Sequence, residues 1–154
     1  MDIQRINRTE AERVFITVLN TEASSMTTGY AVALAFGAAS ADGHQAVLTR
    51  TGQPLNIPGW IGVAAADIAA NMRGRVQCWG YAASIYLSQM GTSVTVTLGD
   101  LFTPGAQAGG LFSALATANY GNVGFKYAMC ISAPTDTLSR AATATYASGI
   151  LRCL

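Results

Sequence analysis

The sequence predicts an all-β fold, a small β-barrel or β-sandwich with short strands, preceded by a charged N-terminal arm. Runs of β-branched and aromatic residues recur along the chain, and Gly and Pro separate them at regular intervals. Small residues are abundant, and they suit tight sheets and barrel interiors. At 154 residues the chain is long enough for one domain with its own core.

The N-terminal segment differs in composition from the rest of the chain. Residues 1–13 hold Arg5, Arg8 and Arg13 together with several acidic residues, whereas only 11% of the whole chain is charged. Ile3 and Ile6 are too few for a strong amphipathic helical face. We therefore expect an arm at residues 1–13 and a single β domain at residues 14–154.

The first third of the domain predicts three strands. Residues 13–19 (RVFITVL) and 30–36 (YAVALAF) are rich in strand-forming or apolar residues, and residues 45–50 form a shorter run. A polar turn at residues 20–25 separates the first two. Gly and Pro then mark a long turn at residues 51–58.

The centre of the chain predicts a buried strand and a long bent one. Residues 60–64 (WIGVA) are uniformly apolar, and residues 65–71 fit either one or two helical turns or a wide turn. Residues 74–87 read as a long strand. Glycine inside a strand often marks a bulge or a bend, so we expect a kink at Gly80.

Five further segments complete the predicted strands. Residues 93–98 (SVTVTL) alternate strictly, which places Val94, Val96 and Leu98 on one face. A short strand is expected at residues 101–103. Residues 109–118 fit a strand or a short helix, and we favour the strand. Strands at residues 123–131 and 142–154 close the domain, the former with one face made of Phe125, Tyr127, Met129 and Ile131.

Charge and hydropathy exclude several classes of partner. The net charge is +1 with a single lysine, Lys126, and the arginines form no basic face, so we expect no nucleic-acid binding. No apolar stretch reaches the length of about 18 residues that a membrane helix needs, and the N-terminus is too charged for a signal peptide. We expect no membrane association and assembly in a cytoplasm.

Few residues of the chain could act in catalysis. The one histidine, His44, lies in a loop of small polar residues, and Asp67, Asp100 and Asp136 each adjoin a turn, where Asp usually bonds the backbone. The cysteines Cys78, Cys130 and Cys153 have no zinc spacing, and we expect buried thiols. We therefore expect no enzyme, no cofactor and no metal site.

Aromatic residues are the remaining candidates for binding. Trp60, Trp79 and Tyr81 favour barrel core or subunit contact, since such residues anchor interfaces. We therefore take these three as candidate subunit-interface residues. A platform for stacking on sugars is the alternative, which would make the chain a carbohydrate-binding β module.

Several segments in order resemble the small capsid decoration (cement) proteins of tailed bacteriophages. Residues 60–81 (WIGVAAADIAANMRGRVQCWGY) are similar to that family's "GVA…DIAA" turn and the "G-x-VQ-x-x-G" strand after it. Residues 92–103, 123–129 and 149–152 continue the similarity, and residues 28–34 also fit. The resemblance extends over roughly residues 26–154 as a spacing of weak motifs, and neither the N-terminal arm nor the pair Trp60 and Trp79 matches it.

The resemblance implies a structural virion protein on the outer capsid surface. Such a protein binds the major capsid protein, stabilises contacts between capsomers, is commonly a homotrimer and takes no cofactor. Because Arg5, Arg8 and Arg13 cluster in a charge-poor chain, we expect them to contact an acidic capsid surface. A phage tail, fibre or head–tail adaptor subunit is the alternative within the virion.

Overall fold

The computed structural model describes residues 12–35, 45–49, 60–87, 97–104, 112–114, 127–132 and 145–153, and these contain nine strands and no helix. The strands are β1 (Val14–Asn20), β2 (Ala31–Leu34), β3 (Gln45–Leu48), β4 (Trp60–Ala64), β5 (Arg73–Leu87), β6 (Leu101–Pro104), β7 (Phe112–Ala114), β8 (Tyr127–Ser132) and β9 (Thr145–Arg152). The all-β prediction is confirmed. Of the predicted arm, only Glu12 and Arg13 are described, and β1 starts directly after them.

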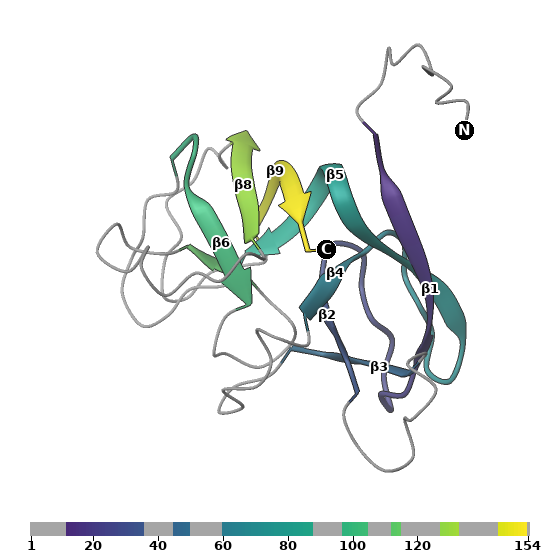
Figure 1. Ribbon diagram of the computed structural model, residues 1–154. Coiled ribbons are helices and arrows are strands. Elements are labelled where there is room, and N and C mark those ends of the chain that lie inside the picture. The colour runs from purple at the N-terminus through teal and green to yellow at the C-terminus, as the bar shows by residue number, and fades with distance from the viewer. Residues whose placement is uncertain are drawn as a thin grey trace, which may run out of the picture.

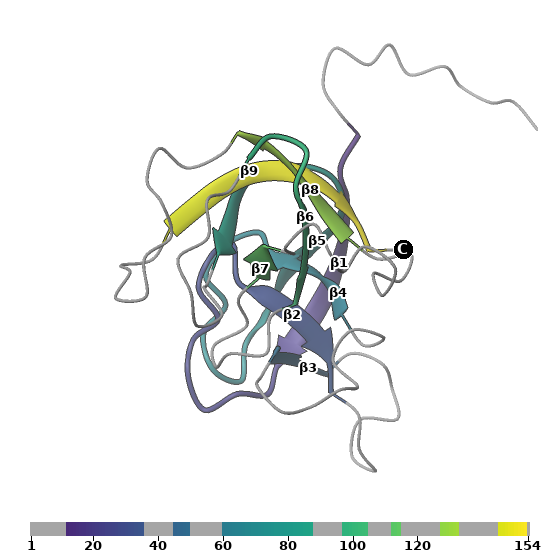
Figure 2. The same cartoon turned by 90° about the vertical axis from the view of Figure 1, so that its left-hand side faces the viewer.

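The strands close into two rings that share β5. The first ring is a five-stranded barrel in the order β1-β3-β2-β4-β5, closed because β1 also pairs with β5. The second ring runs β5-β7-β6-β8-β9 and closes where β9 pairs with β5. Figure 1 shows β1 on one side of β5 and β8 and β9 on the other, and in the turned view β9 and β3 lie at opposite ends of the molecule (Figure 2). Of the two architectures predicted, the barrel is the one found.

Strand β5 passes from one ring to the other at Gly80. Its first part pairs with β1 up to Trp79, and from Trp79 onward it pairs with β9. Gly80 has φ of +88°, and a Cβ on it would lie 1.7 Å from the backbone oxygen of Glu12. The kink predicted at Gly80 is therefore confirmed, and only glycine fits both its conformation and the close approach of the chain before β1.

The side chain of Gln77 supports this bend. It is buried, and its Nε2 donates to the backbone oxygens of Trp79, at 3.2 Å, and Tyr81, at 2.8 Å. A buried amide must find such partners, since an unpaired one costs roughly 1–3 kcal/mol. One amide thus holds the backbone on both sides of Gly80.

Strand β4 separates two hydrophobic clusters. All five of its residues are buried, as a continuous apolar run predicts. Ile61 and Ala64 belong to the cluster inside the first ring, whereas Trp60 and Val63 belong to the cluster that extends into the second. The Trp60 indole also donates to the backbone oxygen of Gly62 at 2.8 Å, so its polar atom is satisfied inside the core.

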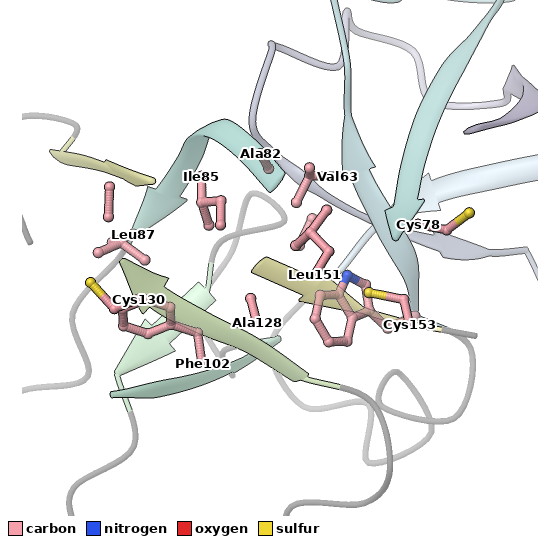
Figure 3. Close-up of a cluster of buried hydrophobic side chains, with 13 residues drawn as sticks. Val63, Cys78, Ala82, Ile85, Leu87, Phe102, Ala128, Cys130, Leu151 and Cys153 are labelled. Carbon is pink, nitrogen blue, oxygen red and sulfur yellow. The ribbon is translucent and has the colours of Figure 1, made fainter. Parts of the chain in front are cut away.

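Small side chains fill much of the second ring. Ala82, Ala128, Cys130 and Ala147 are buried there beside larger residues such as Phe102. Figure 3 shows Ile85, Leu87, Phe102, Cys130 and Ala128 gathered within this ring. A ring of five strands is narrow, and small side chains beside the large ones fill its interior.

One open alternative is decided and one predicted element differs from the structure. Residues 65–71 form a turn with a bridge from Ile68 to Met26, so of the two possibilities, helical turns or a wide turn, the turn is the one found. The strand predicted at 93–98 is wrong at its end: Thr97 to Asp100 form a turn and Leu98 is 70% exposed, while residues 93–96 lie outside the described part. The cause is Asp100, whose carboxylate accepts hydrogen bonds from the backbone nitrogen and the hydroxyl of Thr97 at 2.8 and 2.9 Å.

The other strand predictions agree in place, and those at 13–19, 60–64, 74–87 and 101–103 match the strands found to within one residue at each end. The predictions at 30–36, 45–50, 109–118, 123–131 and 142–154 contain or overlap the strands found there. Only Phe112–Ala114 of the predicted 109–118 run is a described strand. The three cysteines are all buried and form no disulfide, which confirms the prediction of buried thiols.

Replacing Gly80 with Ala tests the bend. The new Cβ would collide with backbone, and the positive φ would be strained, so we expect Gly80→Ala to lose about 3 kcal/mol or more of unfolding free energy. Gly99→Ala is the matched control, since Gly99 has the same φ of +88° and nothing within 4 Å. It should lose only about 1 kcal/mol. Urea denaturation measures both, and equal losses would contradict the role given to the close approach.

Replacing Thr49 with Val should increase the stability of the protein. Its side chain is fully buried, and among the described residues its Oγ1 has no hydrogen-bond partner. Thr49→Val keeps the shape and removes the unpaired hydroxyl, so we expect about 1 kcal/mol more unfolding free energy. Thr17→Val on the exposed side of β1 should change it by less than about 0.5 kcal/mol. A loss of stability in Thr49→Val would show that the hydroxyl is in fact paired.

Candidate interaction surface

The outer face of β5, β9 and β8 carries two rows of large side chains. Tyr81 on β5 pairs with Ile150 on β9, which pairs in turn with Met129 on β8. In the next row Trp79 pairs with Arg152. Residues directly opposite one another point to the same face of a sheet, so these side chains are neighbours.

This face is apolar although it is exposed. Ile150 is 37% exposed and Met129 is 36% exposed, while the alternate residues Ala128, Cys130 and Leu151 are buried. In most sheets with one solvated face, that face is polar. Strands β8 and β9 instead carry apolar groups on both faces, with Leu151 buried inside and Met129 and Ile150 exposed outside.

Two arginines flank the aromatic residues of this face. Trp79 pairs with both Val14 of β1 and Arg152 of β9, so β1 and β9 lie on opposite sides of β5 at this point. Arg13, directly before β1, holds its guanidinium 5.6 Å from the ring centre of Tyr81. Such a cation–π contact contributes roughly 0.5–1 kcal/mol at an exposed site. We call Arg13, Trp79, Tyr81, Met129, Ile150 and Arg152 the aromatic–arginine face.

Three tyrosines continue the outer surface along β5. Tyr86 stacks on Tyr30 with ring centres 4.8 Å apart and contacts Tyr146, its partner on β9, at 5.2 Å. Burial raises the pKa of Tyr86, and the nearby Tyr30 and Tyr146 raise it further. Burial likewise raises the pKa of Tyr146. The cluster thus connects the segment before β2 with β5, which both rings share, and with β9.

The predicted site residues divide into three groups. Arg13, Trp79 and Tyr81 come together on the aromatic–arginine face. Arg5 and Arg8 lie outside the described residues. Trp60 is fully buried within the chain and offers no surface to a partner, so it cannot act in the sugar platform considered from the sequence.

Sequence reasoning missed Met129, Ile150 and Arg152. The available signal was on β9, where Tyr146, Ile150 and Arg152 alternate with Ala147, Gly149 and Leu151. Both faces of such a strand are partly apolar, so alternation alone does not tell which face is inside.

Three of the four described acidic residues, Glu22, Asp67 and Asp100, serve structural contacts. Asp67 accepts hydrogen bonds from the backbone nitrogen and hydroxyl of Thr28, both at 2.8 Å, which lowers its pKa. Asp100 binds Thr97, and buried Glu22 accepts from the backbone nitrogen of Leu48. The prediction that turn Asp residues bond their own local backbone is confirmed for Asp100, whereas Asp67 bonds a distant loop. Asp136 and His44 lie outside the described part.

Neither a metal site nor a membrane helix is found where the structure can be described. In that part of the chain, no three His, Cys, Asp or Glu side chains are grouped so that they could hold a metal ion. No described helix is long and apolar enough to cross a membrane. What the geometry does provide is an exposed apolar and cationic face, which is suited to binding.

Comparison with known proteins gives a likeness of fold. No family model matches the chain, and no curated protein matches it. A solved structure does: the N-terminal base of the head fiber gp8.5 of bacteriophage phi29 superposes with a TM-score of 0.50 and 14% sequence identity. The match covers 91% of this chain and 94% of that one. The two proteins therefore share the fold over nearly their whole lengths.

Raised tyrosine pKa values predict a loss of stability in alkali. Below pH about 10, Tyr86 is neutral in both folded and unfolded chains. Because its pKa is higher in the folded chain, stability is lost as the pH rises through that folded value. The buried thiols of Cys78 and Cys130, whose pKa values are also raised by burial, act in the same direction from about pH 9.

The variant Tyr86→Phe isolates the contribution of Tyr86 to the loss of stability in alkali. It keeps the stacked ring and removes the ionisable hydroxyl, so its melting temperature should fall less steeply than that of the parent above pH 10. Melting curves from pH 8 to 11 measure the difference. Parallel curves for the two proteins would exclude Tyr86 as a source of alkaline instability.

Proposed function

We propose that this chain is a structural protein of a tailed-bacteriophage virion that attaches to the outer capsid surface, with the major capsid protein as its partner. The observation that carries the proposal is the shared fold, over 91% of the chain, with the base of a phage head fiber. The exposed apolar face and the low content of charge, 11% of residues, agree with a protein that functions in contact with others.

Within the virion, we assign the chain a cement role that stabilises contacts between capsomers. The resemblance of residues 60–81 and the later segments to decoration proteins supports this role. A modest interface of roughly 1,000 Å² per copy becomes strong when one symmetric assembly binds several sites at once. No catalytic step is part of this function.

The base of a head fiber is the second candidate. The shared fold with the base of a phage head fiber favours it. The two candidates differ in number: cement proteins occupy sites over the whole shell, whereas a fiber base occupies fewer.

Copy number in purified particles tests the function and separates the candidates. A tagged chain expressed from its native genome should co-purify with virus particles through a density gradient. Quantitative mass spectrometry against the major capsid protein then gives the ratio. A ratio close to one copy per capsid subunit supports cement, a much lower one supports a fiber base, and absence from particles would sink both.

We also propose a homotrimer. Cement proteins of the kind that the sequence resembles are commonly trimers, and trimeric symmetry suits attachment at threefold positions of a shell. Sedimentation equilibrium of the purified chain should give three times the monomer mass. A monomer at micromolar concentration would contradict this assembly.

A further inference from the structure

We propose that the aromatic–arginine face docks onto a different protein, at a surface with an apolar centre and acidic groups around it. This inference rests on the proposed function, under which that surface belongs to the capsid. It adds the face that makes the contact and the chemistry of the surface that accepts it.

The centre of the contact is the row Tyr81, Ile150 and Met129. Tyr81 is partly exposed, and the other two are exposed by more than a third of their surface. Ile150 and Met129 have strand partners on both sides, and Tyr81 pairs with Ile150, so the backbone beneath the row is held in place. Rigid, exposed apolar groups of this kind are typical of the central part of protein interfaces, where Tyr, Trp and Met are enriched.

The edge of the contact is cationic. Arg13 and Arg152 stand on opposite sides of Trp79, one contributed through β1 and the other through β9. The guanidinium group has five N–H donors in one plane, which match the geometry of a carboxylate. A surface with acidic side chains around an apolar patch is therefore complementary in both charge and polarity.

A second copy of this chain is a poorer occupant. If two identical faces met about a twofold axis, the arginines of one would approach those of the other, and like charges across an interface are costly. Of the four described acidic residues, Glu12 is exposed and directly precedes Arg13, and the other three are held in contacts within the chain. Asp67 and Asp100 are engaged with Thr28 and Thr97, and Glu22 is buried.

Binding to undecorated capsids tests the face with matched controls. Ile150→Ser removes an exposed apolar group from the face. Its control, Leu98→Ser, removes an exposed apolar group outside the face, in the turn before β6, where Leu98 is 70% exposed. Arg13→Glu reverses a charge on the face, and Arg73→Glu reverses an exposed one at the far end of β5. Met129→Ser is a second variant that removes an apolar group from the face. Melting curves confirm that each variant is folded.

The face variants should bind about tenfold more weakly than the parent, and the controls within about twofold of it. Added salt should weaken binding of the parent, and Arg13→Glu should reduce this dependence on salt. Parent protein that binds capsids together with face variants that bind equally well would overturn the assigned face and leave the proposed function intact. Parent protein that fails to bind capsids would overturn the proposed function and this inference with it.

Sedimentation of the same variants tests whether a second copy of this chain, instead of a different protein, covers the face. The proposal expects Ile150→Ser and Arg13→Glu to keep the oligomeric state of the parent. Dissociation of the oligomer by either variant, with no such effect from Leu98→Ser or Arg73→Glu, would show that a second copy covers the face and would overturn the proposal.

Discussion

The bend of β5 at Gly80 is the constraint on which the two-ring architecture depends. One strand pairs with β1 and β4 in its first part and with β9 in its second, so it must leave one ring and enter the other without ending. Gly80 makes this possible because it takes a positive φ and leaves room for the backbone of Glu12. The Gln77 amide then binds the carbonyl groups on both sides of the bend.

A second feature of this architecture is that β8 and β9 are apolar on both faces. Ala128, Cys130, Ala147 and Leu151 point into the second ring, where they pack with larger side chains such as Ile85 and Phe102. Met129 and Ile150 alternate with these residues and face outward. The exposed apolar face is thus a direct result of strands that are apolar on both sides.

Assembly of the aromatic–arginine face follows from the same geometry. Arg13 precedes β1, Trp79 and Tyr81 flank the bend, and Ile150 and Arg152 lie near the end of the chain. The exchange of β1 for β9 as the partner of β5 at Trp79 brings these three segments together. Strand pairing on both sides of β8 and β9 holds this face in place, which reduces the entropy lost when a partner binds.

The sequence by itself determined the all-β class, the buried strand at residues 60–64, the kink at Gly80 and the burial of the thiols, because composition, glycine placement and local apolar runs act over a few residues. Trp79, Tyr81 and Arg13 stay predicted contact residues, which the structure brings onto one face. Tertiary structure alone decided that Trp60 is core, that Met129 and Ile150 face outward, and that Arg152 joins them. The physical reason is that pairing between distant strands sets these positions, and local alternation cannot tell inside from outside when both sides of a strand are apolar.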